Sequence, residues 1–482
     1  MTRLYGLTLS AALLTTTAMV GAQDVVTKQY EGGGVYEGTF RDGRQDGTGT
    51  YTLPSGYVYT GEWVDGEIRG EGRATYPDGS IFEGTFAEGE PNGTGRIIFA
   101  DGSTYEGEWV AGRIEGEGVA DYADGTRYTG GFVNALHDGQ GVMESPNGYR
   151  YEGGWSAGVK EGEGRITYPD GSTYEGGMVG NLREGQGVLR TPDGLIYDGA
   201  WEAGQINGVG TLSQPNGDVY TGTLVDGQRD GQGQVTYANG DTYEGDFVAD
   251  RRHGQGTFNG TDGYVYSGEW VEGRIEGVGE VTYPDGSVYV GTFKDDLADG
   301  EGKITYVDGA TYEGGWTAGV IDGQGRAEYP NGLVYEGNFV NAQNDGFGVM
   351  TFTDGYRYEG EWKQGLRHGQ GTATYADGTV YEGAFVDGQR QGQGKIVMAD
   401  GFTYEGGWEA GEIAGEGVAT YANGDVYEGS FAAGRRQGPG TMRYATGQVE
   451  RGRWNAGALA EKEPDPAEGN AEDAAPETGD GD

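Results

Sequence analysis

The sequence contains no cysteine, few cations and little proline. Without cysteine the chain has no disulfide, no thiol nucleophile and no Cys-ligated zinc or iron–sulfur cluster. Asp and Glu number 77 against 32 Lys and Arg, for a formal net charge of −45. This excludes nucleic acid as a partner, because polyphosphate is bound by cations. With 13 Pro and 102 Gly the composition is not collagen-like, so the glycines must have positional roles.

Long apolar runs are also missing, except for the uncharged stretch from Leu4 to Val20. It follows a basic start at Arg3 and ends in Val20-Gly21-Ala22, which is typical of a cleaved secretory signal. A transmembrane anchor is the alternative, but Thr, Ser and Gly dilute the run. We therefore expect a signal peptide over residues 1–22 and export of the chain to the periplasm or the extracellular space.

The dominant feature of the sequence is a tandem repeat of 23 residues. It begins at Tyr36-Glu37-Gly38 and recurs without insertion or deletion up to Tyr427, giving eighteen full repeats between residues 36 and 449. Half repeats extend the predicted array to residues 23–457. Such a period indicates an architecture in which each unit is stabilised by its neighbours.

Within the repeat, numbered from its leading Tyr as position 0, the fixed residues recur at intervals of two. Gly occupies positions 2, 11, 13 and 20, and Trp or Phe occupies position 4 except at Met178 and Leu224. Position 15 is apolar, and position 17 is mostly Tyr or Phe. A period of two predicts strands, so each repeat is expected to be a β-hairpin with positions 0, 2, 4, 13, 15 and 17 on one aromatic face.

The turns and the strand glycines carry further predictions. Pro77-Asp78-Gly79 and its equivalents predict a type I turn followed by Gly in the left-handed region. Gly inside a strand costs roughly 0.5–1 kcal/mol, so we expect aromatic rings of adjacent hairpins to lie over positions 2 and 13. The predicted fold is all-β, an elongated single-layer antiparallel sheet of about 38 strands and close to 180 Å long. From residue 458 to 482 the composition predicts a disordered acidic tail.

Tyr105-Glu106-Gly107-Glu108-Trp109 and Tyr358-Glu359-Gly360-Glu361-Trp362, with Arg367-His368-Gly369-Gln370-Gly371 after the second, resemble the MORN (membrane occupation and recognition nexus) repeat. The resemblance covers residues 30–457. It implies a Gly-rich array of β-hairpins that acts as a scaffold for protein partners or associates with itself. Phosphoinositide or anionic membrane binding has been proposed for some members. It is not expected here, because the basic positions of the family are often acidic or neutral in this chain, as in Val64-Asp65-Gly66-Glu67.

No catalytic constellation stands out. Gly154-Trp155-Ser156-Ala157-Gly158 matches the G-x-S-x-G pattern of a nucleophile elbow, but Ser156 falls at position 5, before a hairpin loop. His137, His253 and His368 fall in the predicted loop at positions 9 and 10, several hairpins apart. We expect no enzyme activity, no cofactor and no metal site.

Carboxylates at position 1 form a predicted ladder on the polar face. We expect part of it to pair with cations at position 14, such as Arg73, Arg96, Arg165, Lys303, Arg326 and Lys395. Capture of Ca²⁺ by the remaining carboxylates is the alternative. A solvated and partly ion-paired face is favoured, because no repeat packs alternate Asp as calcium loops do.

Two functional hypotheses remain. The favoured one is a non-enzymatic, exported scaffold for protein interaction or self-association in the cell envelope. The alternative is a module that binds cell-wall polysaccharide on an exposed row of Trp along the concave aromatic face, although core packing is favoured for these rings. Candidate binding residues for a glycan or another partner are Trp63, Trp109, Trp155, Trp201, Trp270, Trp316, Trp362 and Trp408.

Overall fold

The computed structural model describes residues 24–463. The expected signal peptide, and the acidic segment beyond Glu463, lie outside these residues. The described chain contains 39 strands and no helix. The strands are assigned to one open antiparallel sheet, so the predicted all-β array of tandem hairpins is confirmed. No helix of the described part is long and apolar enough to cross a membrane.

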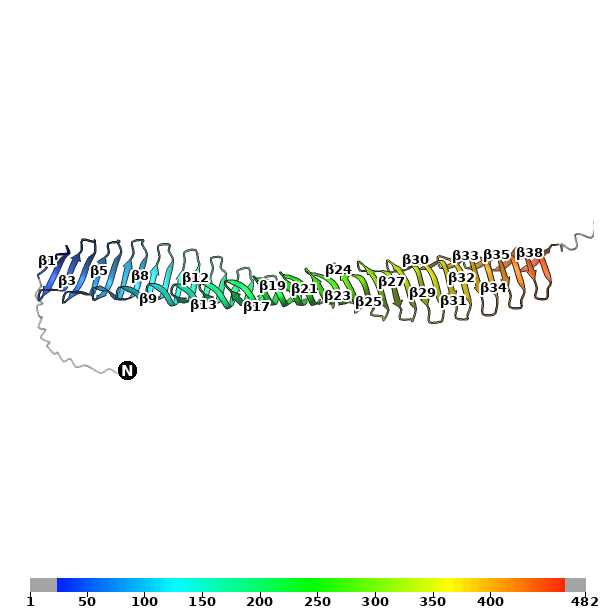
Figure 1. Cartoon of the computed structure of the whole chain (residues 1–482), viewed down its shortest axis with the longest axis horizontal. Coiled ribbons are helices and arrows are strands. Elements are labelled where there is room, and N and C mark those ends of the chain that lie inside the picture. Colours follow the sequence, from blue (N-terminus) through cyan, green and yellow to red (C-terminus); the bar gives the residue numbers. More distant parts are fainter. Residues whose placement is uncertain (1–23, 464–482) are drawn as a thin grey trace, which may run out of the picture. The chain divides into compact units, whose positions relative to one another are not determined.

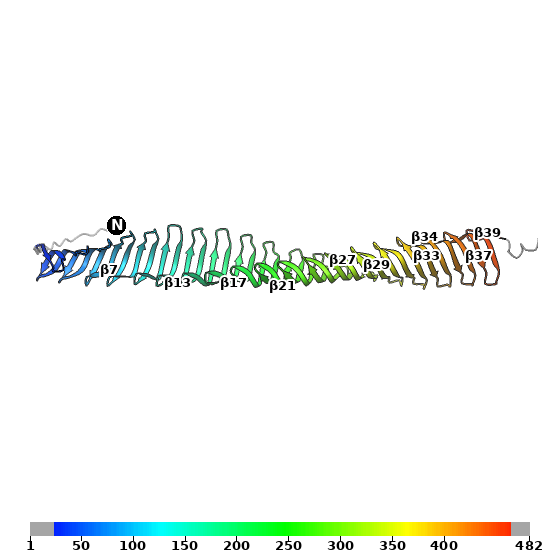
Figure 2. The same cartoon turned by 45° about the horizontal axis from the view of Figure 1, so that its top comes forward.

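Within residues 24–463 the chain divides into two compact units, one up to residue 217 with 224–227, and the other from 228 onward with 218–223. In each unit, consecutive strands lie side by side, and short turns join them alternately at one end of the strands and at the other (Figures 1 and 2). The strands before residue 217 are β1 (Val26–Gln29), β2 (Val35–Arg41), β3 (Arg44–Thr52), β4 (Val58–Val64), β5 (Glu67–Thr75), β6 (Ile81–Ala87), β7 (Glu90–Ile98), β8 (Thr104–Val110), β9 (Arg113–Asp121), β10 (Arg127–Val133), β11 (Leu136–Glu144), β12 (Arg150–Ser156), β13 (Val159–Thr167), β14 (Thr173–Val179), β15 (Leu182–Arg190), β16 (Ile196–Glu202) and β17 (Gln205–Ser213).

The remaining strands begin with β18 (Val219–Val225), which has residues in both units. They continue as β19 (Gln228–Thr236), β20 (Thr242–Val248), β21 (Arg251–Asn259), β22 (Val265–Val271), β23 (Arg274–Thr282), β24 (Val288–Lys294), β25 (Leu297–Thr305), β26 (Thr311–Thr317), β27 (Val320–Glu328), β28 (Val334–Val340), β29 (Gln343–Thr351), β30 (Arg357–Lys363), β31 (Leu366–Thr374), β32 (Val380–Val386), β33 (Gln389–Val397), β34 (Thr403–Glu409), β35 (Glu412–Thr420), β36 (Val426–Ala432), β37 (Arg435–Arg443), β38 (Val449–Asn455) and β39 (Ala458–Lys462).

The hairpin turn between the two strands of a repeat is tighter than the sequence suggested. In the second repeat, Asp65 and Gly66 at positions 6 and 7 have φ angles of 50° and 93°, as a type I′ turn requires. The second strand then starts at Glu67, position 8. The prediction that positions 9 and 10 lie in a loop is therefore wrong, and His137, His253 and His368 lie inside strands.

The turn between repeats has the predicted form. Gly79 donates its N–H to the Tyr76 carbonyl at 3.0 Å and has a φ of 93°. Tyr76 donates its N–H to the Ser80 carbonyl at 2.8 Å, which closes the hairpin. The Asp78 carboxylate accepts the N–H of Ser80 at 2.9 Å. The Asp therefore acts as a turn former at this position.

A row of glycines crosses the strands at mid-repeat. Gly49 lies opposite Gly38 of its own repeat and opposite Gly61 of the next. A Cβ on Gly49 would lie 2.3 Å from the hydroxyl oxygen of Tyr36, and one on Gly38 would lie 2.4 Å from it. The predicted cover of positions 2 and 13 by aromatic rings is thus confirmed, with one correction. The ring nearest these glycines is the Tyr of the same repeat, whereas the prediction took the covering ring from an adjacent hairpin.

The array extends past its predicted end at residue 457. Residues Ala458–Lys462 form β39, which pairs with β38 through Arg453 opposite Glu461 and Gly452 opposite Lys462. The first residues of the expected disordered tail therefore belong to the sheet. The turn before β39 begins at Ala456 and Gly457, both with positive φ, so it has the geometry of the other hairpin turns.

Candidate functional site

The aromatic face of the sheet, defined by positions 0, 2, 4, 9, 13, 15 and 17, is built around the leading Tyr of each repeat. Tyr128 is fully buried, and its hydroxyl donates to the Gly131 carbonyl at 3.0 Å. The equivalent bond from position 0 to position 3 is present in every full repeat that begins with Tyr, and Phe82 is the one residue without a hydroxyl to make it. The ring thereby covers the glycine row while its polar atom stays satisfied.

Burial perturbs the titration of these tyrosines. Desolvation is the largest cause, and it raises the pKa of Tyr105 and of Tyr174 to about 12. At neutral pH both are uncharged donors. They hold the backbone at position 3 and offer no reactive group.

The eight candidate Trp residues are packed inside the aromatic face. Their exposed fractions range from 3% at Trp201 to 9% at Trp316. Each indole N–H donates to the carbonyl of the position-13 Gly in the preceding repeat, at 3.1 to 3.4 Å. The rings of Tyr174 and Tyr197 meet Trp201 edge-on at 5.2 and 5.5 Å. The exposed row of Trp that a glycan would need is therefore absent, and the favoured interpretation, core packing, describes these rings.

The side chain at position 9, which the sequence predicts to lie in a loop, contacts the next repeat. The Arg183 guanidinium carbon lies 3.9 Å from the ring centroid of Trp201, and the guanidinium donates to the Gly204 carbonyl at 2.6 Å. Arg390 repeats this arrangement on Trp408 and Gly411. Such cation–π contacts contribute about 0.5–2 kcal/mol. Arg also lies against Phe rings, as Arg229 does at 5.2 Å from the ring centroid of Phe247.

The side chain at position 10 makes a second contact between repeats, which the sequence did not predict. The Asp138 carboxylate accepts the N–H of Ala157, in the hairpin turn of the next repeat, at 3.1 Å. Glu184 does the same for Ala203 at 2.8 Å, and Asn207 for Asp226 at 2.7 Å. Asp, Glu, Asn and Gln all serve as the acceptor. Because position 10 is not occupied by one residue type, the repeat pattern does not reveal this contact.

The opposite, polar face carries positions 1, 3, 12, 14 and 16. Here Arg73 meets Glu83 at 2.9 Å, Lys303 meets Glu313 at 3.3 Å, and Lys395 meets Glu405 at 3.2 Å. The predicted pairing of positions 14 and 1 is confirmed for these three cations. Arg326 instead pairs with Glu328 on its own strand, and no ion pair is found for Arg96 or Arg165 within residues 24–463. No group of three or more His, Asp or Glu in that range is arranged to hold a metal ion.

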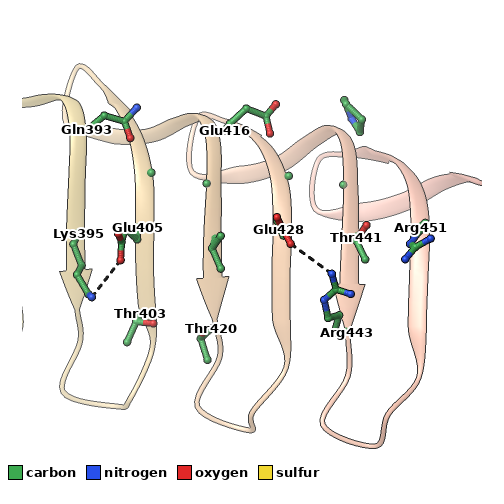
Figure 3. A pocket seen from close by; sticks show the side chains of 16 residues that line it. Gln393, Lys395, Thr403, Glu405, Glu416, Thr420, Glu428, Thr441, Arg443 and Arg451 are labelled. Carbon is green, nitrogen blue, oxygen red and sulfur yellow. Dashed lines mark ion pairs between the residues drawn. The ribbon is translucent and has the colours of Figure 1, made fainter.

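The polar face is hollowed near the end of the array. A depression of about 1010 Å³ spans β33 to β38, where Lys395–Glu405 and Glu428–Arg443 form ion pairs and Arg451 stands beside Thr441 (Figure 3). A similar hollow of about 630 Å³ lies over β5 to β10. The first hollow is lined by charges of both signs and the second mainly by Glu. Both are broad and polar, which suits contact with a polar surface more than enclosure of a small molecule.

The aromatic face carries grooves among its described residues, one near the start and one toward the end of the array. Near the start of the array a groove of about 660 Å³ is lined by Tyr57 and Tyr76, whose ring centroids lie 5.7 Å apart and which we call its tyrosine wall. Glu67 and Glu90 also line it, as do the buried side chains of Trp63, Ile68 and Pro91. Burial raises the pKa of Tyr57 to about 12. Toward the end of the chain, a second groove of about 820 Å³ is lined by Phe402, Tyr421 and Arg436.

The remaining candidates occupy structural positions. Ser156 ends β12 and is exposed. The turn of Ala157 and Gly158 follows it and leads into β13, so the strand–helix context of a nucleophile elbow is missing. His137 stacks on Tyr128 with centroids 3.7 Å apart, and its Nε2 lies 2.6 Å from the Tyr122 hydroxyl. Burial lowers the pKa of His137 to about 4, so it is a neutral packing residue.

The comparisons with curated proteins and with solved structures carry no argument about this chain. No curated protein matches the chain. Among solved structures, the TCP domain of Drosophila melanogaster SAS-4 (dCPAP), in complex with a proline-rich motif of Ana2, is 23% identical and covers 32% of this chain and 85% of that one, with a TM-score of 0.22. The TCP10 domain of Danio rerio CPAP is 17% identical, covers 46% and 94%, and has a TM-score of 0.21. Scores this low support no inference.

The family comparison covers most of the chain. The profile of the MORN repeat matches eighteen consecutive segments, each beginning at the leading aromatic residue of a repeat. The matched residues are 36–56, 59–81, 82–104, 105–127, 128–148, 151–173, 174–196, 197–219, 220–242, 243–263, 266–288, 289–311, 312–334, 335–355, 358–380, 381–403, 404–426 and 427–449. With the hairpin register and the buried Tyr and Trp columns, this match shows that the chain belongs to the MORN repeat family.

Proposed function

We propose that this MORN array is a non-enzymatic scaffold that binds partner proteins, and that it acts outside the cytoplasm, in the periplasm, in the cell envelope or at the cell exterior. The groove on the aromatic face near the start of the array carries the proposal. Tyr57 and Tyr76 are half-buried along its wall, so part of each side chain is open to solvent. An open groove with a Tyr wall and an acidic rim can hold an extended segment of another protein.

The hydroxyls of Tyr57 and Tyr76 support this use of the groove. Neither hydroxyl makes a hydrogen bond within residues 24–463. The hydroxyl of the buried Tyr59, by contrast, donates to the Glu62 carbonyl at 3.0 Å. Aromatic side chains with a free polar tip are typical of protein contact surfaces. The wall therefore offers both apolar area and donors to a bound chain.

Capture of partners from envelope extract tests the scaffold, with the chain from Gln23 onward as bait. The groove variant carries Tyr57→Ala and Tyr76→Ala. The control variant also carries two substitutions to Ala, Thr60→Ala and Glu62→Ala, but on the polar face. A partner held by the parent and the control but lost from the groove variant supports the proposal. A partner retained equally by all three proteins would place the binding surface elsewhere.

Polysaccharide binding remains a second candidate because the same tyrosine rings could stack on sugars. Co-sedimentation of the three proteins with cell-wall material separates the two functions. Sedimentation that soluble glycan reverses and that the groove variant loses would assign the groove to glycan.

Export is proposed from the sequence of residues 1–22 alone. Cell fractionation and N-terminal sequencing of the mature chain test it. A chain that begins at Gln23 and is found outside the cytoplasm is the expected result. An uncleaved chain in the cytoplasm would contradict the proposal.

A further inference from the structure

The sign of the charge on the polar face reverses at the last hairpin. Positions 1 and 3 contain no Lys or Arg in any of the eighteen full repeats, and position 1 is Glu or Asp in most of them. On β38 the same two positions are Arg451 and Arg453. Between residues 435 and 455 five Arg stand against one acidic residue, Glu450, for a local charge of +4 in a chain of −45. This concentration of cations occurs where the array ends.

These cations are largely uncompensated in the described structure. Arg443 on β37 lies 3.6 Å from Glu428, but within residues 24–463 no ion pair is formed by Arg451 or Arg453. All three side chains are exposed. Arg451 and Arg443 are at the edge of the same hollow of the polar face (Figure 3). We refer to Arg443, Arg451 and Arg453 as the terminal cationic patch.

The strand register brings acidic residues to this patch. Glu461 lies directly opposite Arg453 in the β38–β39 ladder. The N–H of Glu463 donates to the Arg451 carbonyl at 2.9 Å, so Glu463 is the next residue on the same face and lies beside Arg451. Opposite charges facing across strands attract. The chain therefore leaves the sheet with its acidic residues aligned to the two new arginines.

The residues that follow have the complementary charge and enough length. From 463 to 482 there are eight acidic residues and no Lys or Arg. Twenty residues reach up to about 65 Å when extended, many times the spacing of about 4.8 Å between strands. Pro464 and Pro466 have no N–H to donate to a strand ladder.

We propose that the acidic segment 463–482 binds the terminal cationic patch of its own chain. Its carboxylates pair with Arg443, Arg451 and Arg453 across the polar face of β37 and β38. The segment thereby covers this cationic surface of an acidic chain and places negative charge beside the open edge of β39, which discourages edge-to-edge pairing with another copy. This contact is independent of the groove on the aromatic face.

A spin label on the full chain tests the contact. The chain contains no cysteine, so Ala474→Cys provides a single labelling site within the segment. Electron paramagnetic resonance is expected to show an immobilised label that becomes mobile in Arg451→Glu/Arg453→Glu and at high salt, where ion pairs are screened. The control Arg96→Glu/Arg113→Glu changes the charge equally at exposed sites of the first unit, and it should leave the label immobilised. Circular dichroism of each variant confirms that the sheet is retained.

Reversal of the opposite partner gives a second readout. Glu468→Lys, Glu472→Lys and Asp473→Lys should release the label in the otherwise unchanged chain, and should restore immobilisation when combined with Arg451→Glu/Arg453→Glu. A label that is equally mobile in the parent and in both sets of variants would overturn the proposal. Immobilisation that disappears on dilution would show that the segment binds a second copy, which would also overturn the assignment to its own chain.

Discussion

Two faces of the same sheet place their side chains in opposite environments. On the aromatic face Trp201 is 3% exposed, touches two Tyr rings edge-on, and has its indole N–H bonded to Gly187 at 3.1 Å. On the polar face Lys303 and Glu313 lie 3.3 Å apart with 53% and 69% of their side chains exposed. Apolar burial therefore stabilises the array on one side only, which leaves the other free to vary in charge.

The largest expected difference between the two faces is their response to alkaline pH, which should destabilise the aromatic face. Burial raises the pKa of Tyr105, Tyr174 and further leading tyrosines to about 12, whereas an unfolded Tyr ionises near pH 10. A raised folded pKa means that the unfolded chain loses protons first. The tyrosines' contribution to stability is thus complete below about pH 10 and is lost as the pH rises to about 12.

The measurement is a pH titration that follows phenolate absorbance and β-sheet circular dichroism together. Both signals should change in the same interval, because ionisation of a buried Tyr requires opening of the aromatic face. Tyrosines that titrate fully near pH 10 while the sheet signal stays constant would show that the face is open to water.

Truncation of one indole gives the next largest effect. Trp201→Ala should lower the free energy of local unfolding by about 3–5 kcal/mol, because it leaves a cavity and removes the stacking surface of Arg183. Glu202→Ala is the matched control, since the adjacent residue points to the other face and is exposed. Hydrogen exchange of the β15–β17 amides measures both variants. A loss of similar size in both would contradict the division between faces.

A single methyl group on the glycine row should cost about 1–3 kcal/mol by overpacking. A Cβ at Gly141 would lie 2.2 Å from the Tyr128 hydroxyl oxygen, so Gly141→Ala must displace the ring. Gln140→Ala changes the neighbouring residue on the polar face and should have little effect. Thermal denaturation of the two variants, followed by local hydrogen exchange, checks the difference. Tolerance of Gly141→Ala would mean that the Tyr rings are not packed against this row.

The sequence predicted the parts of this architecture that depend on identical residues. The Pro-Asp-Gly turn at Asp78 and the association of Tyr with Gly followed from fixed columns, because only Gly fits the left-handed turn and the close approach of a ring. The connections at positions 9 and 10 were missed. There Arg183, Ile68 or Pro91, and Asp138 or Asn207, perform equivalent roles with different side chains.

The candidate site shows the same limit. Trp63 and its equivalents were correctly placed on the face of the leading Tyr, but the period of a strand does not tell whether a ring at position 4 is covered. The neighbours in the sheet decide this, through the indole bond to Gly49 at 3.3 Å. The half-buried tyrosines at the turns, Tyr57 and Tyr76, form the wall of the groove that remains open.

The smallest effect is expected for the ion pairs of the polar face. Lys303 and Glu313 are more than half exposed, so water and salt screen their attraction and the pair should contribute only about 0.2–1 kcal/mol. A double-mutant cycle of Lys303→Ala and Glu313→Ala, at low and at high salt, measures the coupling free energy by hydrogen exchange of β25 and β26. Coupling above about 1 kcal/mol that persists in high salt would contradict this estimate. The expected small, salt-sensitive value would show that charges on this face can change with little loss of stability, as the two arginines of β38 indicate.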